Sequence, residues 1–158
     1  MTDEIFFERQ AAFMDNVIKM HDRVKNIHVS LEKLYPITVI HKGYFYIFDK
    51  NEIGDKYEFK RKVETSVVVS GEILTAFVLD FYDLKPSVVI SENMIGNPGN
   101  DILVLHEFVH CFQLENGAIE IKNGLSIQRQ EWQKAITLGK LIFRFLIPTN
   151  FSLIKQRN

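Results

Sequence analysis

The sequence has few of the features that mark specialised classes of protein. It contains one cysteine, Cys111, so no internal disulfide can form and a disulfide-stapled secreted domain is excluded. The longest apolar candidate for a membrane span, residues 138–148, is too short and carries Lys140 and Arg144. The net charge of -1 offers no electrostatic basis for binding nucleic acid or an anionic membrane.

What remains is the composition of an ordinary globular chain. Its 158 residues are enough for one domain with a real core, and 46% of them are hydrophobic and 25% charged. The first ten residues are polar and charged, and they lack the apolar core of a secretion signal. We therefore expect a single domain over residues 1–158, in the cytoplasm and without a nucleic-acid or membrane partner.

The hydrophobic pattern predicts an α+β fold. Apolar residues at near-helical spacing run from Thr2 or Asp3 to Leu34, which predicts one long helix, or two with a break near His28. Strands are predicted at residues 37–41, 44–48, 63–70, 74–82 and 87–90, with a hairpin at residues 42–43 and a charged turn at 50–62. They would form a mostly antiparallel or mixed sheet of about five strands.

Two more helices are predicted after the strands. A loop over residues 91–100 leads to a second helix, whose N-cap is predicted at Asn100 or Asp101 and whose end is predicted near Asn116 and Gly117. A final helix is predicted from residue 126 to residue 145, and Pro148 ends it.

The first of these helices carries the strongest functional pattern, because residues 106–110 read His-Glu-Phe-Val-His. On a helix, residues four apart lie about 40° apart around the axis, so His106 and His110 can offer two imidazole nitrogens to one metal ion. Glu107 lies on an adjacent side, where it can reach a water molecule at that metal. The surrounding helix is apolar, which predicts burial, with Cys111 as a small core residue. The alternative is two core histidines with an ion-paired glutamate.

A catalytic zinc site needs a third protein ligand, and no histidine follows His110. Glu131 is the best candidate, because on the final helix it shares an apolar face with Ala135 and Leu138. Glu120 is the reserve candidate, and Glu115 is a poor third because it stays on the same helix as the histidines. An exposed Glu131 paired with a nearby lysine is the alternative.

The metzincin continuation of the motif is excluded. It would place glycine at position 113 and histidine at position 116, where this chain has Gln113 and Asn116.

Taken together, His106, Glu107, His110 and a downstream Glu131 resemble the gluzincin branch of zinc metallopeptidases, and in more detail minimal members of the ImmA/IrrE type. The resemblance covers roughly residues 74–151, and it departs from that pattern at Trp132 and at position 135. It implies a zincin-like domain in which residues 87–90 form a sheet edge that pairs with substrate backbone. Residues 91–100 would form a lip of the cleft.

The resulting hypothesis is a zinc-dependent metallopeptidase that acts on a peptide or protein substrate. Glu107 would serve as general base toward a zinc-activated water. The alternative is a zincin-fold regulatory or binding module with little catalysis. Tyr82, Tyr46 and His41 are possible oxyanion donors, although ordinary packing is the favoured interpretation of each. His21 and His28 are predicted to lie at the surface.

Overall fold

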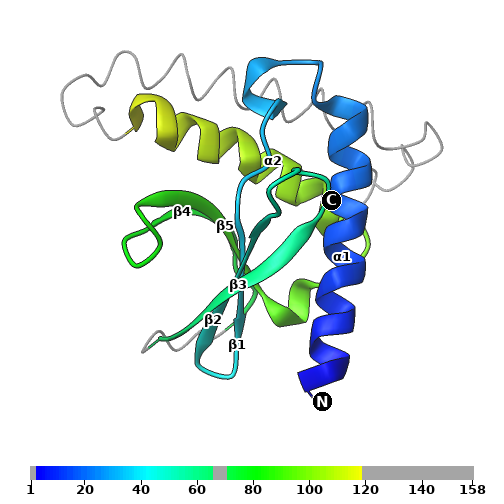
Figure 1. The fold of residues 1–158 in the computed structure, drawn as a ribbon, viewed down its shortest axis with the longest axis vertical. Coiled ribbons are helices and arrows are strands. Elements are labelled where there is room, and N and C mark those ends of the chain that lie inside the picture. The colour runs from blue at the N-terminus through cyan, green and yellow to red at the C-terminus, as the bar shows by residue number, and fades with distance from the viewer. Residues whose placement is uncertain (1–2, 66–70, 119–158) are drawn as a thin grey trace, which may run out of the picture.

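The computed structural model describes residues 3–65 and 71–118. Over these residues the chain forms helix α1 at Asp3–Val24, five strands, and helix α2 at Asn100–Gln113 (Figure 1). The strands are β1 at Ile37–His41, β2 at Tyr44–Lys50, β3 at Tyr57–Glu64, β4 at Leu74–Leu79 and β5 at Lys85–Ser91. The predicted α+β class with a five-stranded sheet is confirmed. No helix in this part of the chain is long and apolar enough to cross a membrane.

The sheet is mixed, with strand order β3-β2-β1-β5-β4. β1 and β5 run parallel, and every other neighbouring pair is antiparallel. The predicted hairpin between β1 and β2 is confirmed, and it turns at Lys42 and Gly43. Their φ angles of 47° and 78° are those of a type I′ turn, whose twist matches that of the flanking strands.

Both helices pack on one face of the sheet and enclose the main core. α2 lies against β4, β5 and α1, and α1 also meets β3 (Figure 1). Alternate strand residues point into this core, among them Ile37 and Val39 of β1 and Val88 and Ile90 of β5. The helices contribute Phe6, Phe13, Met14, Val17 and Val24 from α1, and Val104, Leu105, Phe108, Val109 and Cys111 from α2.

The turn that follows β4 folds across the opposite face of the sheet. Phe81 of this turn stacks on Phe45 of β2, with ring centroids 5.4 Å apart. The Arg61 guanidinium of β3 donates a hydrogen bond to the Phe81 carbonyl. These contacts lie beside a second apolar cluster of buried residues, made of Ile40, Ile47, Leu79 and Val89.

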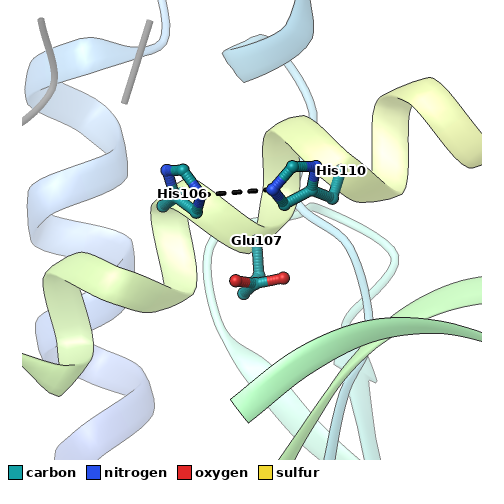
Figure 2. A group of neighbouring side chains, drawn as sticks. All are labelled: His106, Glu107 and His110. Carbon is teal, nitrogen blue, oxygen red and sulfur yellow. Dashed lines mark hydrogen bonds between the residues drawn. The ribbon is translucent and has the colours of Figure 1, made fainter. Parts of the chain in front are cut away.

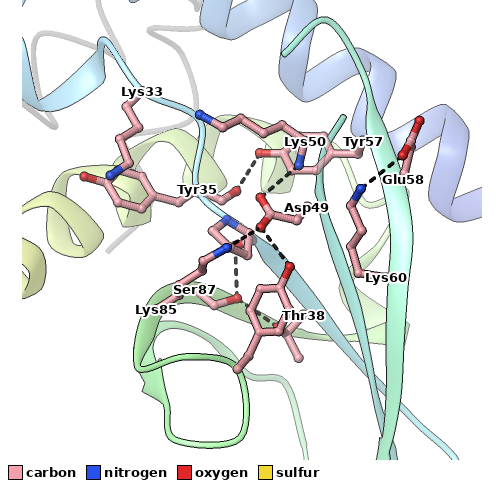
Figure 3. Close-up of polar contacts among 12 residues, drawn as sticks. Lys33, Tyr35, Thr38, Asp49, Lys50, Tyr57, Glu58, Lys60, Lys85 and Ser87 are labelled. Atoms are coloured by element: carbon pink, nitrogen blue, oxygen red, sulfur yellow. Dashed lines mark hydrogen bonds and ion pairs between the residues drawn. The ribbon is translucent and has the colours of Figure 1, made fainter. Parts of the chain in front are cut away.

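Hydrogen bonds and an ion pair connect this turn to one end of the sheet (Figure 3). Asp49, only 8% exposed, accepts a hydrogen bond from the Tyr82 hydroxyl at 2.9 Å and pairs with the Lys85 ammonium at 3.3 Å. The Tyr57 hydroxyl donates to the Tyr35 carbonyl at 2.7 Å. Since a buried carboxylate is tolerated only when it is paired, the contacts with Tyr82 and Lys85 explain how Asp49 can lie inside the fold.

The first helix is shorter than predicted, because α1 ends at Val24 and not at Leu34. The chain then turns, and a 3-10 helix follows at Val29–Leu31. The His28 side chain accepts from the Ser30 backbone N–H and caps this segment, so the predicted break near His28 is the better of the two alternatives. The apolar periodicity continued past α1 because Leu31 and Leu34 are buried without being part of an α-helix.

Two strands also differ from the prediction. β3 occupies much of the segment expected to be a charged turn, and only its last two residues fall in the predicted 63–70 strand. β3 is an edge strand with most of its side chains exposed, so it lacks the alternation that identifies a half-buried strand. β4 ends at Leu79 and not at Tyr82, because the chain leaves the sheet to form the turn described above.

The two histidines expected at the surface differ from each other. His28 is exposed, but His21 is only 4% exposed, and its ring lies edge-on to Phe108 of α2. His21 falls on the apolar stripe of α1, three residues before the buried Val24. The predicted strand segment 66–70 and the final helix at 126–145, with Glu131, lie outside the described residues, and the single domain over residues 1–158 stays a prediction.

Candidate metal centre

Glycine residues with left-handed backbone angles mark both ends of helix α2. It starts after Gly99, whose φ of 86° is left-handed, and no side chain caps it, so the predicted caps Asn100 and Asp101 are wrong. Its end agrees with the prediction, because Asn116 and Gly117 leave the helical conformation and Gly117 has a φ of 121°.

The buried side of α2 explains the apolar character of its sequence. Leu105, Phe108 and Cys111 are fully buried in the main core, which confirms Cys111 as a core residue. His106, Glu107 and His110 occupy the remaining side and are half-buried. The helix is therefore anchored by its apolar face while its polar residues stay partly accessible.

The two histidines face each other from successive turns of α2 (Figure 2). Their Nε2 atoms are 3.1 Å apart, and the ring planes are inclined at 78°. Candidate ligand atoms of His106, Glu107 and His110 all lie within 4.8 Å of one another. The predicted convergence of the two imidazoles is thus present, and these three residues form the one group of potential metal ligands identified among residues 3–65 and 71–118.

Glu107 points toward the sheet (Figure 2). Its Oε2 accepts a hydrogen bond from the Ala76 backbone N–H of β4 at 2.9 Å. Burial raises the pKa of the Glu107 carboxyl, although the electrostatic interaction with His110 and the Ala76 N–H both act to lower it. A carboxylate with a raised pKa is better matched to accepting a proton near neutral pH.

The histidines are suited to binding a cation. Burial lowers the pKa of His106, and the neighbouring His110 lowers it further. A neutral imidazole is the form that binds a metal ion, so this shift keeps His106 competent near neutral pH. His110 is also held through its other nitrogen, because Nδ1 lies 3.0 Å from the Gln113 Oε1.

Sequence reasoning did not assign this contact to Gln113, which it used only to exclude the metzincin pattern. The signal that could have found it is the spacing, since residues three apart are neighbours on a helix surface.

Among the predicted third ligands, Glu131 and Glu120 lie outside the described residues. Glu115 is described, and it accepts hydrogen bonds from the Tyr35 hydroxyl at 2.8 Å and from the Lys33 ammonium. Burial opposes ionisation of Glu115, but these two donors outweigh it and lower its pKa. This carboxylate is engaged by other partners, in agreement with its low rank as a ligand.

The strand beside the site is not the predicted one. β5, which contains residues 87–90, lies between β1 and β4, so it is not a sheet edge. Within residues 3–65 and 71–118, β4 is the edge strand on this side of the sheet, and Ala76 lies opposite Val88 of β5. The Val88 N–H donates to the Pro36 carbonyl, so the backbone groups of Val88 point toward β1 and not toward β4. Ala76 and Val88 are therefore a non-hydrogen-bonded antiparallel pair, and the Ala76 N–H points away from β5. Glu107 uses this outward N–H.

The three possible oxyanion donors all have other contacts. The Tyr82 hydroxyl donates to Asp49, and His41 pairs with Glu92. Tyr46 is buried against Phe6, with ring centroids 4.7 Å apart. These contacts agree with the interpretation that the three side chains have structural roles.

Comparison of the chain with protein-family models, with curated proteins and with solved structures found no match. The interpretation of the site therefore depends on its own geometry and on the sequence pattern.

Proposed function

We propose that this chain is a zinc-dependent metallopeptidase of the zincin type, with His106 and His110 as metal ligands and Glu107 as general base. The observation that carries the proposal is the convergence of two imidazole Nε2 atoms, 3.1 Å apart, beside a half-buried carboxylate on the same helix. Two nitrogens this close can share a proton or share a metal ion.

The donors fit zinc. Catalytic zinc sites use imidazole nitrogen and carboxylate oxygen and keep one position open. His106 and His110 supply two nitrogens, and their partial exposure leaves the site accessible. For the third ligand we retain Glu131, with Glu120 in reserve, as proposals from the sequence.

The chemistry divides between the metal and the chain. Zinc, when bound, acidifies water and polarises a carbonyl oxygen. Glu107 takes a proton from the attacking water and passes it to the leaving amine. The Ala76 N–H holds one oxygen of the carboxylate, which leaves the other oxygen for this transfer.

A peptide or protein is the substrate that the surroundings favour. Among the described strands β4 is an edge strand next to α2, and the pairing with β5 turns the backbone groups of Leu74 and Val78 outward, together with the Ala76 carbonyl. An extended peptide can add to such an edge by main-chain hydrogen bonds. β4 thus takes the role that the resemblance assigned to residues 87–90.

Metal analysis of purified and zinc-loaded protein tests the ligands. The wild type should hold about one zinc per chain, and His106→Asn and His110→Asn should lose it, because a catalytic site with only one histidine binds zinc poorly. His28→Asn is the matched control, since His28 is exposed and lies outside the cluster. Glu131→Gln and Glu120→Gln, measured in the same way, distinguish the two candidate third ligands.

Hydrolysis of fluorescein-labelled casein tests the general base. Glu107→Gln should keep the zinc and the hydrogen bond from Ala76 while turnover falls by about 100-fold or more. A wild type that cannot take up zinc would refute the proposal. A protein that binds zinc but hydrolyses neither casein nor a peptide library would instead support the alternative of a binding or regulatory module.

A further inference from the structure

We infer that Gln113 is a positioning residue that holds His110 in its Nδ1–H tautomer, so that the Nε2 lone pair is the atom offered to a metal ion. The metal-binding part of this inference rests on the proposed function, whereas the tautomer does not. Gln113 is the last residue of α2 and lies one turn after His110.

The atoms in contact determine the direction of the hydrogen bond. The Gln113 atom that lies 3.0 Å from His110 Nδ1 is Oε1. With the Gln113 amide in this orientation its oxygen can only accept, so the contact is a hydrogen bond when Nδ1 carries the proton and donates it. A neutral imidazole carries one proton, and Nε2 of His110 is then an acceptor.

The tautomer of His110 also determines that of His106. The two Nε2 atoms are 3.1 Å apart, and one of them must donate for this to be a hydrogen bond. If His110 Nε2 accepts, the same inference places a proton on His106 Nε2 in the metal-free protein. His110 is therefore preorganised as a ligand, and His106 is the residue that must change. For His106 to offer Nε2 to a metal ion as well, its proton would have to move from Nε2 to Nδ1 by exchange with solvent.

The geometry explains why this role falls to Gln113. The contact joins residues three apart on one helix, so it forms without help from a distant segment. Partners that bond the outer nitrogen of a ligating histidine fix its tautomer and ring orientation, and their loss commonly costs about 10- to 100-fold in metal affinity.

Nuclear magnetic resonance of the full chain, labelled with 15N in its histidines, tests the tautomers. At pH 8 in the metal-free protein, His110 should show the Nδ1–H pattern and His106 the Nε2–H pattern, assigned with His106→Asn and His110→Asn. On addition of zinc, His106 should switch while His110 keeps its tautomer.

Substitutions of Gln113 test its role. Gln113→Leu should shift the tautomer equilibrium of His110 away from Nδ1–H and weaken zinc binding by about 10- to 100-fold, measured by competition with a fluorescent chelator. Gln113→Glu keeps an acceptor at the same place and should retain or raise the affinity. Asn116→Ala is the matched control, because this exposed amide lies near the same helix end but bonds to the Phe112 carbonyl.

Two results would overturn the inference. One is an Nε2–H tautomer for His110 in the wild type, and the other is an unchanged His110 tautomer in Gln113→Leu. If the wild type takes up no zinc at all, the proposed function fails, and the tautomers of the metal-free protein alone then decide the role of Gln113.

Discussion

The hydrogen bond between the Ala76 N–H and the Glu107 carboxylate can be removed without disturbing the sheet. Ala76→Pro deletes an N–H that points away from β5, so no ladder bond is lost, and proline is tolerated at such edge positions. A hydrogen bond to a charged acceptor contributes about 1.5–3 kcal/mol net. Because Glu107 is only half-buried, we expect the lower end of this range, about 1.5 kcal/mol.

A double-mutant cycle measures this contact directly. The free energy of unfolding in urea would be determined at pH 8, with a chelator present, for wild type, Ala76→Pro, Glu107→Ala and the double variant. The coupling energy should be about 1.5 kcal/mol. Val78→Pro is the control, because its N–H has the same outward direction but does not contact Glu107, and its coupling to Glu107→Ala should be near zero. A coupling below about 0.5 kcal/mol for Ala76, within the scatter of additive pairs, would refute the reasoning.

Three further predictions concern the fold. Burial lowers the pKa of His21, and a hydrogen bond to the Leu31 backbone only partly offsets this effect. The native state therefore resists protonation of His21. The free energy of unfolding should therefore fall as the pH drops below 6.5. His21→Leu should make the free energy of unfolding depend less on pH in this range. An unchanged slope in this variant would contradict the prediction. Leu84 is 67% exposed with a φ of 53°, so Leu84→Gly should raise the unfolding free energy by about 0.5–1 kcal/mol in urea titrations, and a loss would contradict the strain argument. Tyr35→Phe removes a hydrogen bond to Glu115 and should cost about 1–2 kcal/mol in wild type but little in a Glu115→Ala background.

The sequence predicted best where structure depends on near neighbours. The hairpin at Lys42 and Gly43 follows from a two-residue turn between apolar strands, and the end of α2 follows from Asn116 and Gly117. The sequence-based prediction failed where the hydrophobic pattern allowed two interpretations. Leu31 and Leu34 continue a helical spacing outside any α-helix, and β3 lacks alternation because most of its side chains are exposed. His21 was misplaced because histidine is common at surfaces, although its position on the apolar stripe of α1 indicated burial.

The sequence by itself determined the centre of the candidate site. Residues four apart on a helix lie on one face, so His106 and His110 had to converge once the segment was helical. Only the tertiary structure decided what surrounds them. Strand order depends on pairing between distant segments, and two apolar strands of similar composition do not reveal which one is the edge. In the tertiary structure, β4 lies at the edge of the described sheet and its Ala76 N–H points toward Glu107. The two histidines lie on the half-buried side of α2.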